Sequence, residues 1–475
     1  MVISPIDRDR LHRTAKIAVD LGLVADVDSA AAYLENLVLQ IHVGPDLHED
    51  LAGQAALLTA INAGGRAMLG GVRAVIEDNP TPSLPWAQGQ DLATAIQTFG
   101  GSVVDTHTPE HPVIVIGAPN RPLGVEIQLR LRYSGWSGGI AETWDPPGSQ
   151  AMPLAGVVAG ALAVSEVFQH ALGSNTAACR DTGLSLWCPD LPWQSSEALG
   201  PALQRLPTGV WLLGLGHLGQ ASAWSLGCLP YGKPDDLEVY LVDFDTVVEA
   251  NHSTGLLTLP GDIGRRKTRV VAARLEQLGH LTRLIERPFD NHLRPSNTEP
   301  QLALAGFDKI EPRRVLGDKF GRVVDAGLGA GPTEYLDILL HTFPSELTPA
   351  DAFPFRSEDD PELSPAYEAE INKRISEGME AGTARCGVTE LAGATPAAAF
   401  VGAIAGALSV ADLLRSLHGD HHYETLNVDL RSPSDVVGPL SVRALQPFNP
   451  GFTTALLPAS ASRPQRTQVT AQPGA

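Results

Sequence analysis

The residues that could do chemistry are concentrated between Gly209 and Arg274. The apolar segment Val210–Leu213 leads into the sequence Gly214-Leu215-Gly216-His217-Leu218-Gly219, and a second apolar segment ends at Asp243. A glycine turn of this kind lets the backbone approach phosphate, and the helix that follows offers unpaired N–H groups to an anion. An acidic residue 24 positions after the last glycine can accept the hydroxyls of a ribose. The pattern predicts a nucleotide site on a strand, a turn, a helix and a strand.

Three polar residues downstream narrow the choice of nucleotide. Asp245, Asn251 and Lys267 lie 2, 8 and 24 residues after Asp243. Dinucleotide dehydrogenases share the glycine fingerprint, but they do not need an Asn and a Lys beside the phosphates. An enzyme that directs attack on the α-phosphate of ATP needs both, because negative charge builds up there and pyrophosphate leaves as an anion. The spacing therefore favours ATP chemistry.

Over about Gly209–Gly419 the chain resembles the ThiF/MoeB-type adenylating enzymes, which include the activating enzymes of ubiquitin-like proteins. The resemblance implies that ATP and Mg²⁺ are bound, with Asn251 and Lys267 on the phosphates. A magnesium ligand is expected in a D-N-x-x-x-R-type segment after the third strand, where Asp308 is the best match. The other nucleotide-binding residues that it implies are Gly214, Gly216, His217, Leu218, Gly219, Asp243 and Asp245.

One position departs from the family pattern. The family normally carries an Arg three residues after the motif Asn, and this chain has Thr254 there. A guanidinium that would hold the γ-phosphate with two hydrogen bonds is therefore absent from this segment. Either Arg265, Arg266 or another arginine takes its place, or the site binds ATP without turning it over well.

The chain has four cysteines, Cys179, Cys188, Cys228 and Cys386. They form no Cys-x-x-Cys pair, so we expect no structural zinc. Sparse cysteine, together with the lack of a signal peptide, predicts a reducing cytoplasm and no disulfides. Cys228 falls on the helix after the glycine turn and is expected to be a packing residue. Cys179 and Cys188 fall in a Pro-, Ser- and Trp-rich segment and have no expected role.

Cys386 is the candidate nucleophile. It precedes Pro396 and the Ala/Gly-rich helix predicted at Ala397–Leu417, as does the catalytic cysteine in the compact activating enzymes, which lies on a loop. The resemblance implies attack by its thiolate on an acyl adenylate, which would give a thioester. Arg385 and a nearby helix N-terminus would lower the pKa of the thiol. The alternative is a free, half-buried cysteine without a chemical role.

The segment 343–386 is Pro-rich, acidic and weakly periodic. In the family it is the crossover segment that passes over the active site and holds the C-terminal tail of the protein substrate. A mobile surface loop is the alternative, and the two are compatible. A long loop attached to a catalytic core is more often functional than idle.

The N-terminal half has no glycine fingerprint. Strands are predicted at Asn36–Val43, Val72–Ile76, Val113–Ile116 and Val125–Leu131, with a helix at Leu51–Met68. Gly44-Pro45-Asp46 stands where a phosphate loop would be, and proline supplies no N–H group to a phosphate. A mononucleotide-type fold without a nucleotide is therefore expected.

An internal repeat links the two halves. Val157–Gly173 aligns without gaps with Ala403–Gly419 at an offset of 246 residues. Similar composition alone could produce this match, but a duplicated domain explains it better. We therefore predict an α/β chain of two Rossmann-like domains, the first inactive, that form an internal pseudo-dimer; a homodimer is also possible. The expected division is a degenerate domain 1–173, a linker 174–206, an adenylation domain 207–447 and a disordered tail 448–475.

Composition sets outer limits on function. The 475 residues are 43% hydrophobic, enough for two ordinary cores, and the formal net charge is −20 without a basic cluster. This charge argues against a nucleic-acid substrate. The two Ala/Gly-rich helices are interrupted by Glu166 and His170, and by Asp412 and Arg415, so they are not predicted to cross a membrane.

The leading hypothesis is ATP-dependent activation of a ubiquitin-like or sulfur-carrier protein. The carrier's C-terminal carboxylate would attack the α-phosphate, and Cys386 would then take the acyl group and pass it to a conjugating-type partner. The alternatives are adenylation for sulfur transfer without a thioester relay, and a non-catalytic scaffold, which Thr254 favours. A plain dehydrogenase would leave Asn251 and Lys267 without purpose.

Overall fold

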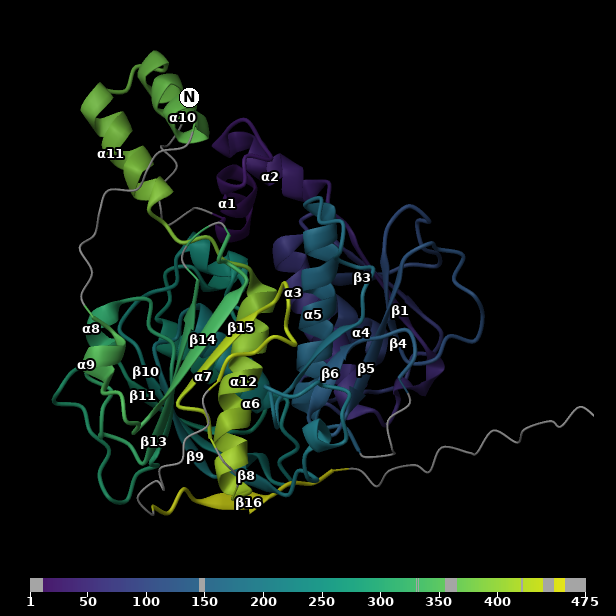
Figure 1. Ribbon diagram of the computed structural model, residues 1–475, viewed down its shortest axis with the longest axis vertical. Coiled ribbons are helices and arrows are strands. Elements are labelled where there is room, and N and C mark those ends of the chain that lie inside the picture. The colour runs from purple at the N-terminus through teal and green to yellow at the C-terminus, as the bar shows by residue number, and fades with distance from the viewer. Residues whose placement is uncertain are drawn as a thin grey trace, which may run out of the picture.

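Two seven-stranded sheets form the framework of the protein (Figure 1). The computed structural model describes residues 12–144, 150–329, 331, 333–354, 365–419, 422–438 and 448–457. The strand orders are β3-β2-β1-β4-β5-β6-β7 and β11-β10-β9-β12-β13-β14-β15. In each sheet the first four pairings are parallel and the last two are antiparallel. The two halves thus have the same topology, and the predicted pair of Rossmann-like domains is confirmed.

The strands are short and mostly buried, as expected of β-branched and leucine-rich segments in parallel sheets. The first sheet consists of β1 (Leu39–Val43), β2 (Val72–Ile76), β3 (Gly101–Val103), β4 (Val113–Ile116), β5 (Gln128–Ser134), β6 (Ser137–Ile140) and β7 (Thr182–Ser185). The second consists of β9 (Gly209–Leu213), β10 (Glu238–Val242), β11 (Leu281–Ile285), β12 (Leu302–Ala305), β13 (Arg322–Leu328), β14 (Asp337–Phe343) and β15 (Thr425–Asp429).

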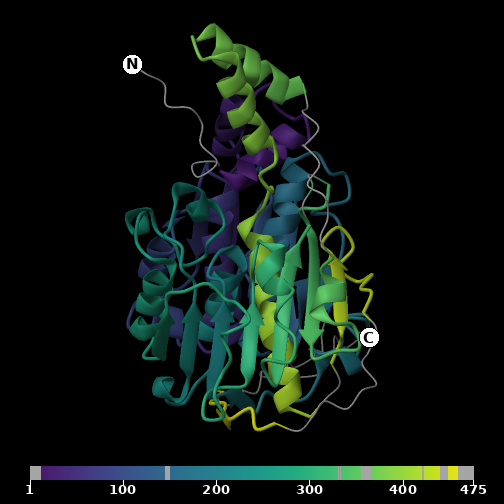
Figure 2. The same ribbon diagram turned by 90° about the vertical axis from the view of Figure 1, so that its left-hand side faces the viewer.

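Four helices lie between the two sheets (Figures 1 and 2). They are α3 (Leu51–Ala67), α5 (Pro153–Ala171), α6 (His217–Gly227) and α12 (Ala399–Leu417). Helix α3 follows β1 and α6 follows β9, which are the first strands of the two sheets along the chain. Helix α5 precedes β7 and α12 precedes β15, which are the last strands of the two sheets. Helix α12 packs on α5 as well as on α3 and α6, so one layer of helices joins the halves.

The repeated glycines explain how these helices approach one another so closely. A Cβ at Gly156 or Gly160 of α5 would lie 1.8 or 2.3 Å from a carbonyl oxygen of α3. At the equivalent positions of α12, a Cβ at Gly402 would lie 2.1 Å from the His217 ring, and one at Gly406 would lie 2.5 Å from the Ala221 backbone. Each pair is spaced four residues apart and therefore shares one helix face. The aligned repeat is thus the same helix contact built twice.

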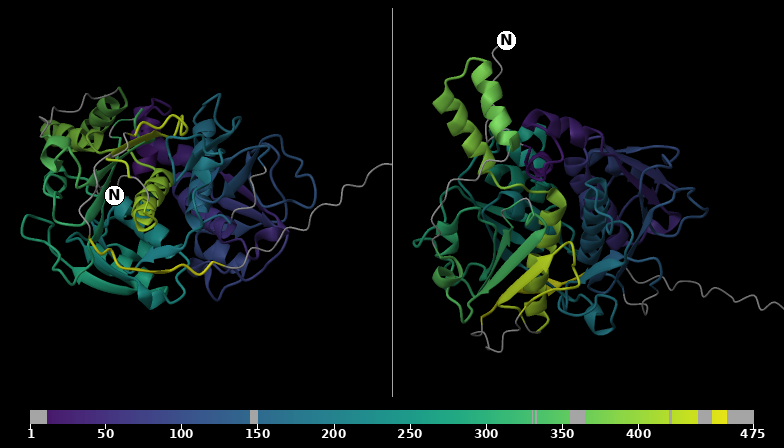
Figure 3. Two further views of the ribbon diagram at one scale, coloured as in Figure 1. Left: turned by 60° about the horizontal axis from the view of Figure 1, so that its bottom comes forward. Right: turned by 45° about the horizontal axis from the view of Figure 1, so that its top comes forward.

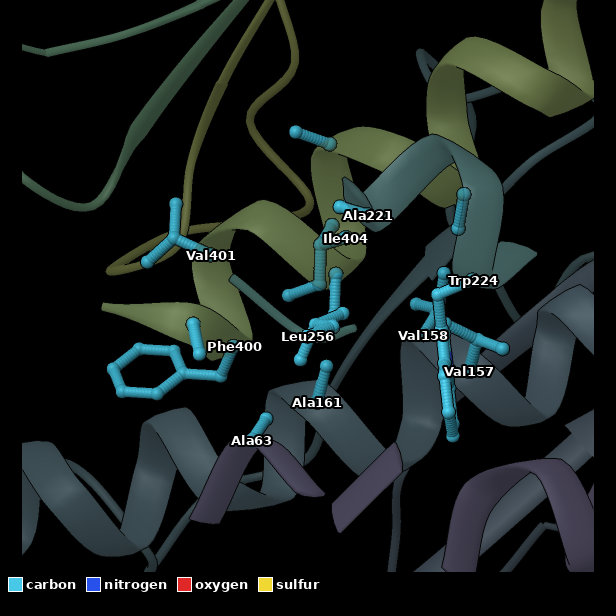
Figure 4. Close-up of a cluster of buried hydrophobic side chains, with 14 of the residues drawn as sticks. Ala63, Val157, Val158, Ala161, Ala221, Trp224, Leu256, Phe400, Val401 and Ile404 are labelled. Carbon is cyan, nitrogen blue, oxygen red and sulfur yellow. The ribbon is translucent and has the colours of Figure 1, made fainter. Parts of the chain in front are cut away.

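The core between the sheets is continuous across the two halves. Figure 4 shows Val157 and Val158 of α5, Trp224 of α6, and Phe400 and Ile404 of α12 in this cluster, and each is at most 2% exposed. Burial of one such side chain contributes about 1.5–3 kcal/mol. Helices α5 and α12 are long and apolar enough to cross a membrane, but 89% and 94% of their most apolar windows are buried inside the protein. They are core helices.

The remaining helices surround this framework. They are α1 (Arg13–Asp20), α2 (Val27–Glu35), α4 (Leu92–Thr98), α7 (Lys267–Gln277), α8 (Ile310–Arg313), α9 (Pro349–Ala352), α10 (Pro365–Ser376) and α11 (Ala381–Ala392), with short 3₁₀ helices η2 (Pro45–Leu47), η3 (Pro85–Ala87), η4 (Glu197–Leu199), η5 (Pro234–Asp236), η6 (Glu249–Ser253) and η7 (Pro260–Asp262).

Two domain limits expected from the sequence are wrong. Strand β7 belongs to the first sheet, so the expected linker 174–206 contains the last strand of the N-terminal half. Part of the expected disordered tail is also folded, because β16 (Phe452–Thr454) pairs with β8 (Arg205–Pro207) beneath the second sheet. The rest of that tail, 458–475, lies outside the described residues.

The expected crossover segment is largely helical. Helices α10 and α11 form a hairpin that stands beside α1 and α2, away from the two sheets (Figure 3). The Tyr367 hydroxyl donates a hydrogen bond to Asp20 at 2.6 Å, and the Lys16 ammonium group lies 2.7 Å from the same carboxylate. The hairpin is thus fastened to the N-terminal half, and residues 355–364 lie outside the described part.

Candidate functional site

The glycine turn joins β9 to α6 in the conformation that the sequence predicts. Gly214 has a φ of +81°, which side chains disfavour, and a Cβ at Gly219 would lie 1.9 Å from the Gly214 carbonyl oxygen. A Cβ at Gly216 would meet nothing within 4 Å, and no side chain caps the N-terminus of α6. The turn therefore presents free backbone N–H groups to open space, as a phosphate site requires.

The acidic and basic motif residues meet beside this turn. Asp243 follows β10, and its carboxylate accepts the Leu215 and Asp245 backbone N–H groups, both at 2.7 Å. Burial raises the pKa of Asp243, and the charge of Lys267 opposes this effect. Lys267 begins α7, and its ammonium group lies 3.1 Å from Asp245. The expected ribose acid and phosphate lysine are thus brought together.

The Asn251 segment is attached to α6 through a glutamine that the sequence argument missed. Asn251 lies in η6, where its Oδ1 accepts the Val248 N–H at 3.0 Å. Gln220 is buried on α6; its Nε2 donates to the Leu215 carbonyl, and its Oε1 accepts the Leu257 N–H at 3.0 Å. One side chain therefore fixes the glycine turn relative to the segment that follows Asn251.

Asp308 lies two residues after a close contact with the glycine turn. A Cβ at Gly306 would come within 2.7 Å of Leu218 and 3.0 Å of the Gly219 nitrogen, which places the end of β12 against the turn. Asp308 itself is exposed. Among the described residues no group of three or more His, Cys, Asp or Glu side chains could hold a metal. A single carboxylate such as that of Asp308 could hold Mg²⁺ only together with phosphate oxygens and water.

Cys386 does not lie on a loop, so that expectation is wrong. It lies within α11, five residues after the first residue of the helix, and its side chain is outside the described part. The N-terminal effect of a helix on a thiol fades beyond the first turn. Arg385 is 3.6 Å from Glu368 of α10 in an exposed ion pair, so part of its charge is already neutralised.

An arginine from the N-terminal half lies near the position of Thr254. The Arg13 backbone N–H donates to Ser253 Oγ at 3.2 Å, and its guanidinium donates to the Thr395 carbonyl at 3.2 Å. The two expected substitutes also have partners, since Arg265 pairs with Asp262 and Arg266 donates to the Phe244 carbonyl. No local sequence signal points to Arg13, since this contact spans 240 residues.

His217 of the glycine turn connects this region to α12. Burial, together with the charges of Arg66 and Arg13, lowers the pKa of His217 to about 4. The imidazole is therefore neutral near pH 7. Because a Cβ at Gly402 would overlap the ring, only glycine allows α12 to pack here.

The equivalent turn of the N-terminal half carries carboxylates. Asp50 caps α3 by accepting the Gly53 N–H at 2.9 Å, and Asp46 accepts the Ala118 N–H at 3.0 Å. Glu77 follows β2 as Asp243 follows β10, but it accepts the Asn120 N–H at 3.0 Å. An added phosphate would meet negative charge at this end of α3.

The internal duplication extends to a pair of buried glutamines. Gln54 of α3 donates to the Leu47 carbonyl before its helix and accepts the Leu84 N–H beyond β2. Gln220 makes the same two types of contact in the second half. Both stand in a Gly-Gln-Ala sequence, Gly53–Ala55 and Gly219–Ala221, which is the signal that could have revealed them.

Comparison with known proteins places the chain in a class. Residues 38–186 match the family model of the BilD N-terminal domain, and residues 206–420 match that of the BilD C-terminal domain. The bacterial E1-like protein BilD of Collimonas sp. (strain OK412) is 35% identical over 460 residues, which cover 95% of this chain and 97% of that protein. The fold and the comparison thus define an E1-like protein.

The chain belongs to the BilD family of bacterial E1-like proteins. Among solved structures, that of E. coli MccB is 14% identical with a TM-score of 0.33, over 54% of this chain and 68% of that chain. E. coli MccB with ATP is 13% identical with a TM-score of 0.29, over 49% of this chain and 62% of that chain. PaaA is 10% identical with a TM-score of 0.32, over 49% of this chain and 63% of that chain.

Proposed function

We propose that this protein activates the C-terminal carboxylate of a small ubiquitin-like or sulfur-carrier protein with Mg-ATP in the cytoplasm. A carboxylate oxygen attacks the α-phosphorus, the bond between the α- and β-phosphates breaks, and pyrophosphate leaves. The product is an acyl adenylate. The observation that carries this proposal is the uncapped N-terminus of α6 beside Asp243, Lys267 and Asp308.

Each motif residue has a role in this scheme. The backbone N–H groups at Gly216–Gly219 hold the phosphates, and Asp243 accepts the ribose hydroxyls with the lone pairs that Leu215 and Asp245 leave. Lys267 and the Asn251 amide stabilise the charge that develops on the α-phosphate. Asp308 would hold Mg²⁺, which would supply positive charge beside the β- and γ-phosphates.

The N-terminal half contributes to the active site without binding a nucleotide of its own. The carboxylates of Asp46 and Asp50 occupy its phosphate position. Its α1 instead brings Arg13 to Ser253, next to Thr254. The Arg13 guanidinium donates to the Thr395 carbonyl in this structure, and on ATP binding it would turn to the γ-phosphate in place of the missing family arginine. This division of labour explains why both halves occur in one chain.

The thioester step is the second part of the proposal. The Cys386 thiolate attacks the acyl carbon, AMP leaves, and the thioester then passes to a conjugating-type protein. Because α11 stands apart from the glycine turn (Figures 1 and 3), the hairpin has to move toward the turn before this attack. The alternative is a sulfur-carrier adenylyltransferase in which Cys386 has no role.

Exchange of labelled pyrophosphate into ATP tests the adenylation step. It requires the purified protein, Mg-ATP and the carrier, which a gene neighbour encoding a short protein that ends in glycine would supply. We expect exchange that depends on the carrier and that is lost in Asp308→Asn. If the wild-type protein binds ATP but shows no exchange, the scaffold alternative that Thr254 favours is correct.

The same samples test the relay. Cys386→Ala is expected to keep the exchange and to lose a thiol-sensitive adduct with the carrier. Cys179→Ala is the matched control, because Cys179 is an exposed free cysteine outside the site. An adduct that persists in Cys386→Ala would refute the thioester relay and leave adenylation intact.

A further inference from the structure

A cavity of about 770 Å³ lies between the two halves. Its walls come from α3, from the segment 85–100, from the segment 252–260 and from the last turn of α7. Among the α7 residues that line the cavity, Arg274 lies nearest to the nucleotide site, and it is about 10 Å along the helix from Lys267. None of Gly214–Gly219, Asp243, Lys267 or Asp308 contributes. The lining thus shares none of these residues, although His252 adjoins Asn251, and the cavity volume is that of a small-molecule site.

The charge of this cavity is opposite to that of the protein. No Asp or Glu is among its lining residues, although the chain has 54 acidic and 34 basic residues. Arg66, Arg274 and His252 line it, together with glutamine side chains such as Gln88 and Gln277. Arg274 lies 3.1 Å from the Asp262 carboxylate, which it shares with Arg265. Burial and the charge of Arg66 lower the pKa of His252, so His252 offers an anion a hydrogen bond and Arg66 offers it a charge without a carboxylate partner.

Arg66 is a buried cation whose partners are all neutral. It is 6% exposed, and it donates to Asn62 Oδ1 at 3.0 Å and to the carbonyls of His252, Leu256 and Thr258. It forms no ion pair with any described residue. Burial lowers the pKa of Arg66 to about 10, and no carboxylate opposes this effect. Its hydrogen bonds are thus largely satisfied by neutral acceptors, while its charge has no anionic partner among the described residues and one N–H of Nη1 remains.

The rest of the cavity suits an apolar group. Trp86 lines it and stacks on Trp224 with ring centroids 4.9 Å apart, and Phe99 meets the edge of the same ring. Leu256 and Leu278 complete the apolar wall. We infer that this cavity binds a small organic anion, whose charged oxygens lie on Arg66 and His252 and whose ring or chain lies against Trp86 and Phe99. This inference goes beyond the proposed function and needs neither ATP nor a carrier.

Fluorescence titration with 8-anilinonaphthalene-1-sulfonate tests the site on the full-length protein. We expect one saturable site per chain, displaced by 1-naphthoate or 1-naphthyl phosphate but not by neutral 1-naphthalenemethanol. Whichever of the two anions competes better identifies a carboxylate or a phosphate as the natural group. Mg-ATP should not displace the probe, because the cavity lining contains none of Gly214–Gly219, Asp243, Lys267 or Asp308. Displacement by ATP, or equal displacement by the neutral alcohol, would overturn the inference.

Variants locate the bound probe. Arg66→Gln should weaken it at least about tenfold, since a charge-assisted contact is lost. Gln277→Glu, which adds a carboxylate at the cavity wall, should weaken it several-fold, and Gln204→Glu is the matched control because Gln204 is exposed at β8. Thermal unfolding reports whether Arg66→Gln folds; if it does not, Gln277→Glu decides. Unchanged affinity in a folded cavity variant would show that no anion binds there.

Discussion

Replacing Gly216 by alanine separates nucleotide binding from folding. A Cβ at this position meets no atom within 4 Å, and φ is −76°, so the side chain has room in the protein itself. Alanine is a poorer N-cap than glycine, which costs up to about 1 kcal/mol of stability. The space that the methyl group enters is where we propose that the phosphates lie.

The loss of affinity follows from the hydrogen bonds that the methyl group prevents. A phosphate oxygen has to approach to about 2.9 Å of the backbone N–H groups of α6, and each such charge-assisted bond contributes about 1.5–3 kcal/mol. Loss of two bonds costs at least about 3 kcal/mol, or more than about a hundredfold in Kd. The measurement is calorimetric titration with Mg²⁺ and a non-hydrolysable ATP analogue, alongside thermal unfolding.

Gly261→Ala is the matched control for this substitution. A Cβ at Gly261 also meets nothing within 4 Å, but this glycine lies in η7, away from the turn. Its Kd should equal that of the wild-type protein. If Gly216→Ala binds the analogue within threefold of the wild type, the phosphates do not lie at the N-terminus of α6 and the reasoning is wrong.

Three further outcomes follow from the structure. Gly160→Ala and Gly406→Ala should each lower the free energy of unfolding by about 1–3 kcal/mol or more, because the added Cβ would lie 2.3 Å from Ala56 and 2.5 Å from Ala221; urea unfolding measures this, and near-zero effects would contradict the close helix contact. His341 is 7% exposed, and burial lowers its pKa to about 4 in the folded protein, whereas the unfolded chain has a pKa of 6.5 at this residue. The stability that the neutral ring contributes is therefore complete above pH 6.5 and is lost as the pH falls toward 4. His341→Phe keeps a ring beside Phe353 but cannot be protonated. The free energy of unfolding of this variant should therefore fall by about 2–3 kcal/mol less than that of the wild type between pH 6.5 and 4, and an equal fall in both proteins would disprove this. Arg13→Gln should lower the pyrophosphate exchange rate at least about tenfold, whereas His48→Gln, at an exposed position, should not change it; equal rates would exclude Arg13 from the site.

The sequence predicted the parallel strands and the glycine turn because these depend on local patterns. The apolar segments at Val72–Ile76 and Val113–Ile116 became β2 and β4 with the same bounds. The helix repeat indicated the duplicated topology, since small residues at a fixed offset reflect the same packing requirement in both halves. The site residues Asp243, Asp245 and Lys267 meet because they end or begin elements at one edge of the sheet.

What the sequence did not predict depends on contacts between distant segments. Thr182–Ser185 is too short and polar to be recognised as a strand, and it becomes β7 only because β6 offers an edge. The strand Phe452–Thr454 likewise exists only as a partner of β8. The contact between Arg13 and Ser253, and the absence of an anionic partner for Arg66, arise from the packing of one half on the other. Such contacts leave no local pattern.

A crystal structure of the protein with Mg²⁺ and a non-hydrolysable ATP analogue tests the central claim most directly. The account predicts the triphosphate on the backbone N–H groups of Gly216–Gly219, the ribose hydroxyls on Asp243, and the metal on Asp308. A triphosphate bound anywhere else on the chain, or no bound nucleotide at concentrations that saturate the protein in solution, would contradict it.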